Sequence, residues 1–285
     1  MTFNGPPAPS PESLPGTVET PEYWKENLQF VYPKRLYETE FAFAKLMAGR
    51  QGISVFEAVE KYAPLVNKAI RTEDKDKTLL PGITEENLLE AGYEEVLERR
   101  KSYSKEGLTY QHKEENRFGC FYYRYQKDQQ AIALHFFNAE AEEEFINGKD
   151  MSKGPLSKEK FERRRHELKD MFTDIKERYP DVKYVVGRSN LYNVEAYRRL
   201  YPDTYEVGDI DYDPELWAGN TDIWGQFLGG NDKEPGQYGF KDELAQEFLK
   251  KAESVPLDRL ADALPNPPRT ARGDIQDFYD LYGIE

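Results

Sequence analysis

The residues with the clearest chemical potential lie in Gly187-Arg-Ser-Asn-Leu-Tyr-Asn193, where a predicted strand gives way to a polar loop and a short predicted helix. Arg188 can bind an anion. Ser189 and Asn193 offer hydrogen-bonding groups beside the N–H groups of a helix N-terminus, which favour anions. With Arg198, these are the candidate substrate-binding residues of this stretch. An ordinary helix N-cap is the alternative interpretation of Asn193.

Groups able to move a proton are few. None of the three histidines, His112, His135 and His166, stands at a metal-ligand spacing such as HExxH. His135 lies in an aromatic strand, where it is either a proton acceptor or an ordinary hydrogen-bonded strand histidine. Tyr192 and Tyr201 are the candidate proton donors. These three are the candidate catalytic residues, and no metal site is predicted.

Other motifs point less clearly to chemistry. No GxSxG, P-loop or GxGxxG pattern occurs in the sequence, and its single cysteine, Cys120, excludes a disulfide framework and a cysteine-based zinc site. Trp224 is a candidate substrate-binding ring, with an anchor in the hydrophobic core as the equal alternative. No bound cofactor is predicted from these patterns.

The charge pattern restricts the ligands. The chain has 39 Lys and Arg against 53 Asp and Glu, a formal net charge of −14, which argues against duplex DNA as a partner. Residues 153–199 are different, with 13 basic against 8 acidic side chains. A basic island in an acidic protein favours a small anionic substrate. A solvated helix face is the alternative reading of the same charges.

Helices should dominate the region before the site. The sequence predicts a helix over 35–49, a Ser54–Glu57 capping box, a helix divided by Pro64, and a further helix capped by Thr84. The aromatic segments 118–125 and 131–138 predict a β-hairpin. A long helix over 157–179 and a strand over 183–187 follow, so we expect a parallel βαβ crossover.

These elements predict an α+β protein with an α/β-like core, in which a mixed sheet with a long crossover helix follows a helical subdomain. Residues 1–21 form a proline-rich disordered leader, 22–110 the helical subdomain, and 111–285 the α/β core with an irregular C-terminal segment. No apolar run is long enough for a membrane span and no signal peptide is evident, so a soluble cytoplasmic protein is expected. The leader is also a candidate docking segment for a protein partner.

Two resemblances extend this interpretation. The string Ser189-Asn-Leu-Tyr-Asn-Val-Glu-Ala-Tyr-Arg-Arg-Leu-Tyr-Pro202 resembles a motif of an uncharacterised family of bacterial proteins, which implies no activity. The order strand, long helix, strand, followed by Asn193, Ala196 and Tyr201, is similar to the second half of GNAT-type acyltransferases. That resemblance implies acyl-CoA as co-substrate between splayed parallel strands, its pyrophosphate at a helix N-terminus, and a tyrosine as general acid.

The sequence therefore supports two hypotheses of function. The first is a soluble enzyme that acts on a small anionic or acyl-activated substrate, with a GNAT-like N-acyltransferase as its concrete form. The alternative is a non-catalytic binding or assembly protein. The proline-rich leader and the lack of a complete catalytic motif favour this alternative.

Overall fold

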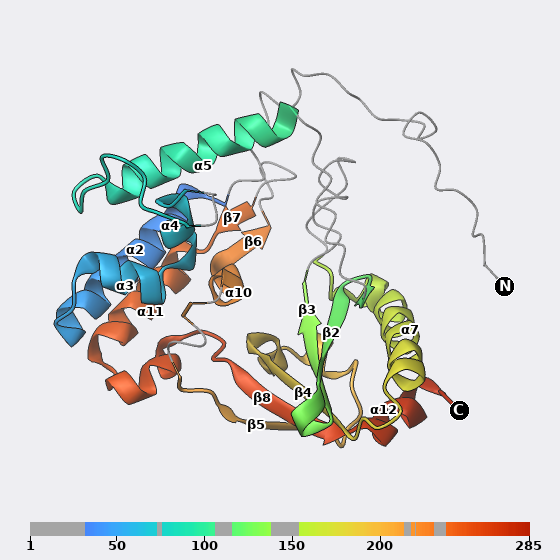
Figure 1. Ribbon diagram of the computed structural model, residues 1–285. Helices are drawn as coiled ribbons and strands as arrows, with labels where there is room; N and C mark the ends of the chain where they lie inside the picture. Colours follow the sequence, from blue (N-terminus) through green and yellow to red (C-terminus); the bar gives the residue numbers. More distant parts are fainter. Residues whose placement is uncertain are drawn as a thin grey trace.

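The computed structural model describes residues 32–72, 76–105, 116–137, 154–213, 218–219, 221–230 and 238–285. The expected leader at 1–21 lies outside these residues. The described chain is a mixed α+β protein, as predicted, and its buried apolar side chains form two separate hydrophobic clusters. One cluster lies in a helical unit and the other beneath a β-sheet, and Figure 1 shows the two units side by side.

The first part of the helical unit follows the sequence closely. Ser54 accepts a hydrogen bond from the N–H of Glu57, as the capping box predicts. Pro64 begins a new helix, because it lacks the N–H that a continuous helix would need there. The last helix begins later than expected, since the Thr84 N–H donates to the Asn87 side chain instead of Thr84 capping the helix. The helices are α2 (Lys34–Gln51), α3 (Val55–Tyr62), α4 (Pro64–Ala69) and α5 (Leu88–Lys105).

The second part of the helical unit comes from the last third of the chain. The Trp224 ring packs against Phe43 and Phe248, with centroid distances of 5.7 and 5.8 Å, so segments far apart in sequence share one core. Part of the irregular C-terminal segment that was predicted to follow the α/β core within 111–285 therefore belongs to the helical core, since much of 218–264 packs there. The elements are α10 (Thr221–Trp224), η6 (Gly225–Phe227), β6 (Leu228–Gly230), β7 (Tyr238–Phe240), α11 (Asp242–Ser254) and η7 (Leu257–Ala263).

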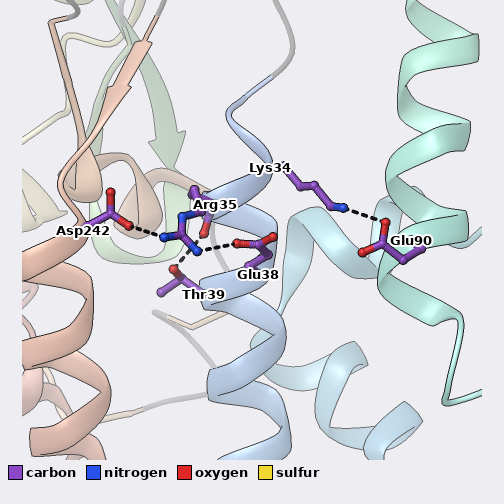
Figure 2. Close-up of polar contacts among 6 residues, drawn as sticks. All are labelled: Lys34, Arg35, Glu38, Thr39, Glu90 and Asp242. Carbon is purple, nitrogen blue, oxygen red and sulfur yellow. Dashed lines mark hydrogen bonds and ion pairs between the residues drawn. The ribbon is translucent and has the colours of Figure 1, made fainter.

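Polar contacts join the start of α2 to its neighbours on both sides (Figure 2). Lys34 forms an ion pair of 2.6 Å with Glu90 of α5. Arg35 lies 3.1 Å from both Glu38 and Asp242 of α11. These side chains are largely exposed, so solvent screens each pair and it contributes little to the stability of the fold. The buried rings of the core contribute far more to the stability of this unit.

The described strands of the main unit form a six-stranded sheet in the order β1-β2-β3-β4-β8-β5. The predicted hairpin is present as the antiparallel pair β2–β3. The predicted crossover is present too, since β3 and β4 are parallel and the long helix α7 connects them. The elements are β1 (Arg117–Phe118), β2 (Phe121–Gln126), η3 (Lys127–Gln129), β3 (Ala131–Phe136), η4 (Lys158–Lys160), α7 (Phe161–Arg178), β4 (Tyr184–Ser189), β5 (Glu206–Ile210), β8 (Arg269–Asp274) and α12 (Ile275–Tyr282).

The described helices α7 and α12 pack on one face of this sheet. Ile132 and Val185 point to the face on which α7 and α12 pack. The sheet and these two helices bury their apolar side chains together there. Figure 1 shows both helices on the side of the sheet away from the helical unit. Side chains of the opposite face belong to neither hydrophobic cluster and, apart from the buried Ala131, are half-buried or exposed. They include Tyr122, Arg124, Ala133, His135, Tyr184, Val186, Arg188 and Arg272. We call this the open face.

The basic stretch does not form one patch. Arg163 and Arg164 both pair with Glu167, but the Arg164 side chain is 1% exposed and that of Arg163 is 60% exposed. Arg188 lies on the open face, on the other side of the sheet from α7. Consecutive residues of a helix point in different directions. Many cationic residues in one stretch of sequence therefore need not lie together on one surface. The interpretation of this stretch as favouring a small anionic substrate therefore has no single basic patch behind it among the described residues. Among the described helices, none combines the length and apolar composition that crossing a membrane requires.

Candidate functional site

The candidate site lies where β3 and β4 stop pairing. Their register ends at Leu134 opposite Gly187, yet each strand continues for two more residues. Beyond that point β3 pairs only with β2, and β4 pairs only with β8. The two parallel strands therefore separate at their carboxyl ends. We call this opening the fork, and the next residues on its two sides are His135 and Arg188.

Arg188 lines the fork from β4. Its Nε lies 2.6 Å from Oδ2 of Asp211, the residue that follows β5, and its side chain is 30% exposed. Its Nη2 is buried and has no hydrogen-bond partner among the described residues. A guanidinium has five N–H donors in a fixed fan, so one carboxylate partner leaves part of the group able to bind an anion.

His135 lines the fork from β3, on the same face as Arg188. Its ring stacks on Tyr122 of β2, with centroids 4.5 Å apart and an interplanar angle of 9°. Both side chains are half-buried. The predicted catalytic histidine and the predicted anion-binding arginine are thus brought to one end of the open face.

Tyr192 approaches the fork from the covered face. It lies in η5 (Asn190–Asn193), and its hydroxyl is 2.8 Å from that of Tyr205. Both hydroxyls lie against Gly187, the last residue of β4 that pairs with β3, where a Cβ would come within 1.8 Å of the Tyr192 hydroxyl. Burial raises the pKa of Tyr192 well above its ordinary value, and the neighbouring Tyr205 adds to this shift. The phenol is therefore protonated at neutral pH.

Tyr201 is part of the same aromatic cluster, farther from the strands. Its ring packs 5.0 Å from Tyr197 and 5.3 Å from Tyr205, and only 5% of the residue is exposed. Burial is the main cause that raises its pKa well above the ordinary value. Its hydroxyl has no hydrogen-bond partner of good geometry among the described residues. The surroundings of Tyr201 are those of a core residue.

Ser189 and Asn193 have structural roles in the loop after β4. The Ser189 hydroxyl accepts from the N–H of Leu191 and caps η5. The Asn193 amide nitrogen donates to the carbonyls of Asn190 and Pro267, and its oxygen accepts from Nε of Arg269. Asn193 does not cap α8 (Glu195–Arg198), which begins after Val194. The N-cap interpretation was wrong, because the side chain fastens the loop to the chain before β8 instead.

The remaining two candidates lie away from the fork. Arg198 is exposed on α8. Trp224 is 1% exposed, lies in the helical core, and donates its indole N–H to the carbonyl of Ala218. A ring enclosed in this way cannot face a ligand, so the prediction that Trp224 binds substrate is corrected to the alternative of a core anchor.

Sequence reasoning missed several residues around the fork. Tyr122 and Arg124 alternate with Phe121 and Tyr123, and this period of two was the signal that they share the face of His135. No local sequence pattern indicated Asp211 as the partner of Arg188. Asp211 follows β5 and Arg188 lies in β4, and these strands are not neighbours in the sheet, because β8 lies between them.

The described residues hold no group of three or more His, Cys, Asp or Glu side chains that could bind a metal ion. Comparison with protein-family models, with curated proteins and with solved structures found no match to this chain.

Proposed function

We propose that the protein is an enzyme that acts on an acyl-activated substrate, with GNAT-like N-acyl transfer as its concrete form. The observation that carries this proposal is the fork. Two parallel strands joined by a long helix separate after Leu134 and Gly187, and the resemblance implies an acyl donor between strands of this kind. Strands that stayed paired to their ends would leave no backbone edge for such a ligand.

The side chains at the fork suit the two proton transfers of the reaction. The amine nitrogen of an acceptor attacks the acyl carbonyl carbon, and the carbon–sulfur bond of the thioester breaks. His135 on the open face accepts the proton that the amine loses. Tyr192 donates a proton to the leaving thiolate, and its raised pKa keeps it in the donating form at neutral pH. The reaction consumes no oxidant or reductant.

The start of the crossover helix supports the same proposal. Ser157 precedes η4 and α7 in an extended conformation, and its side chain makes no capping hydrogen bond. Its hydroxyl is buried and has no partner among the described residues. A hydroxyl beside the N–H groups of a helix N-terminus is suited to a phosphate oxygen. The pyrophosphate of an acyl-CoA is therefore proposed to bind there.

The test combines binding and turnover. We expect CoA at millimolar concentration to raise the melting temperature, since a ligand that binds only the folded state stabilises it. Mass spectrometry should show consumption of acyl-CoA with a panel of amines.

His135→Gln should abolish turnover and retain the CoA-dependent stabilisation. His166→Gln, at an exposed position on α7, is the matched control and should behave as wild type. Absence of both stabilisation and turnover in the wild type would refute the proposal.

A second candidate is the non-catalytic binding or assembly protein. It is favoured by the burial of Tyr192, Tyr201 and Trp224, which encloses three of the predicted reactive or ligand-facing side chains. If this second function is correct, a partner should co-purify with the chain in stoichiometric amount. Deletion of residues 1–21 should abolish that co-purification. A partner that remains bound after the deletion would exclude the leader as its docking segment.

A further inference from the structure

We propose that the open face at the fork binds a small ligand in which a planar ring carries an anionic group, the chemistry that nucleotides and aromatic carboxylates share. The residues concerned are Arg117, Tyr122, Arg124, His135, Phe137 and Arg188, which we call the fork cluster. This ligand is distinct from the acyl donor that the proposed function places between the strands. The proposal does not depend on acyl transfer.

The register of the sheet brings the side chains of the fork cluster to one face. Arg117 pairs with Tyr122, and Tyr122 pairs with His135, so one row of side chains crosses β1, β2 and β3 on the open face. Arg188 stands on the other side of the fork on the same face. Arg124 and Phe137 lie two residues from Tyr122 and His135 and therefore point to the same side.

The rings form a connected aromatic surface. Tyr122 and His135 lie nearly parallel, and Phe137 packs against Tyr122 at 5.9 Å with an interplanar angle of 60°. All three side chains are half-buried and belong to neither hydrophobic core. A planar ligand ring can extend such a stack, and each added aromatic contact contributes favourably.

Two guanidinium groups border these rings, and a third lies across the fork. Arg117 lies 4.2 Å from the centroid of Phe137, and Arg124 lies 5.8 Å from that of Tyr122. Arg188 stands across the fork on the same face, where its side chain is 30% exposed and its buried Nη2 has no partner among the described residues. Guanidinium planes stack on rings and bind carboxylate or phosphate through paired hydrogen bonds. Ring and anion therefore both find complementary groups within one cluster.

The charge of the whole protein limits the size of the ligand. A chain of net charge −14 repels long polyanions, whereas a local group of arginines can still attract a small anion. Asp211 offsets part of the charge of Arg188. A mononucleotide or a single aromatic carboxylate fits this balance better than a nucleic acid strand.

Calorimetric titration of the full chain with four probes tests the proposal. AMP and benzoate carry both a planar ring and an anionic group, ribose 5-phosphate lacks the planar ring, and adenosine lacks the charge. We expect AMP, benzoate or both to bind, and the two incomplete probes to bind about tenfold more weakly or not at all. Binding of AMP alone would identify nucleotides as the source, and binding of benzoate alone aromatic carboxylates.

Variants locate the binding. Arg188→Gln and the exposed Arg124→Gln should each weaken binding by about tenfold, as expected when a charge-assisted contact is lost. Lys169→Gln, at an exposed position on α7, is the control and should leave the affinity unchanged. Arg124→Gln keeps the test valid if Arg188→Gln unfolds the chain. Equal binding of complete and incomplete probes, no binding of either complete probe, or an equal loss in the control would overturn the proposal. A chain that binds AMP and consumes no acyl-CoA keeps this inference and loses the acyl-transfer proposal.

Discussion

Gly187 is the residue whose change should disturb the fork most directly. In Gly187→Ala the new Cβ would lie 1.8 Å from the Tyr192 hydroxyl, 2.7 Å from the Tyr205 hydroxyl and 2.9 Å from Cζ of Tyr192. Neither tyrosine can simply turn away, because they are 2% and 6% exposed and are enclosed by other aromatic rings. The two hydroxyls must separate, or the strand must shift.

The size of the effect follows from these contacts. Forcing a methyl group into a packed core costs about 1–3 kcal/mol. Losing the hydrogen bond between two buried hydroxyls costs about a further 1–3 kcal/mol. We therefore expect Gly187→Ala to lower the free energy of unfolding by about 2–6 kcal/mol, which is a large part of the stability of an ordinary domain.

Urea denaturation, followed by the near-ultraviolet circular dichroism of the tyrosines, measures this loss. The midpoint should fall while the slope with denaturant stays the same. Gly225→Ala is the matched control, since a Cβ there meets nothing within 4 Å, and its unfolding free energy should stay within about 0.5 kcal/mol of wild type. Adding Tyr192→Phe to Gly187→Ala removes the closest atom and should restore part of the loss. A Gly187→Ala protein as stable as wild type would show that the close packing of the hydroxyls on the strand is incorrect.

Two further predictions concern buried charges. Glu40 is fully buried, and burial raises its pKa well above the ordinary 4.5. Its contribution to stability is therefore present at low pH and is lost as the pH rises through the raised value. The stability gained by Glu40→Gln over wild type should accordingly grow with pH in urea titrations, and a gain independent of pH would contradict this. Glu167 binds the buried Arg164 and the N–H of Cys120, so Glu167→Ala should destabilise the fold by about 3 kcal/mol in the same assay. Exposed Glu162→Ala on the same helix should have almost no effect, and equal losses in the two variants would exclude the buried pair as the cause.

Local patterns in the sequence predicted most of the helices and strands. The capping box, the proline division and the alternating aromatic hairpin each depend on residues close together in the chain, and each is present. The strand at 269–274 was not predicted, because its sequence, Arg-Thr-Ala-Arg-Gly-Asp, has the charge and small residues of a loop. It is a strand because it fills the position between β4 and β5.

The candidate site was predictable in part. His135 and Arg188 were chosen for their chemistry, and the parallel crossover brings both to the fork. Asn193 and Trp224 were assigned to the substrate, yet one fastens a loop and the other fills the helical core. A polar or aromatic side chain has the same local sequence signal in either role, and only its distant neighbours decide between them.

The amino-acid sequence by itself determined which segments are helical, which are extended, and that the hairpin and the crossover strand lie together. These properties follow from backbone propensities and from hydrophobic periodicity over a few residues. Tertiary structure alone decided that residues 218–264 join the N-terminal helices, that Arg188 meets Asp211, and that two tyrosine hydroxyls lie against Gly187. Such contacts depend on how the chain closes around its two cores, and the free energy of burying those cores is shared among residues that no local pattern connects.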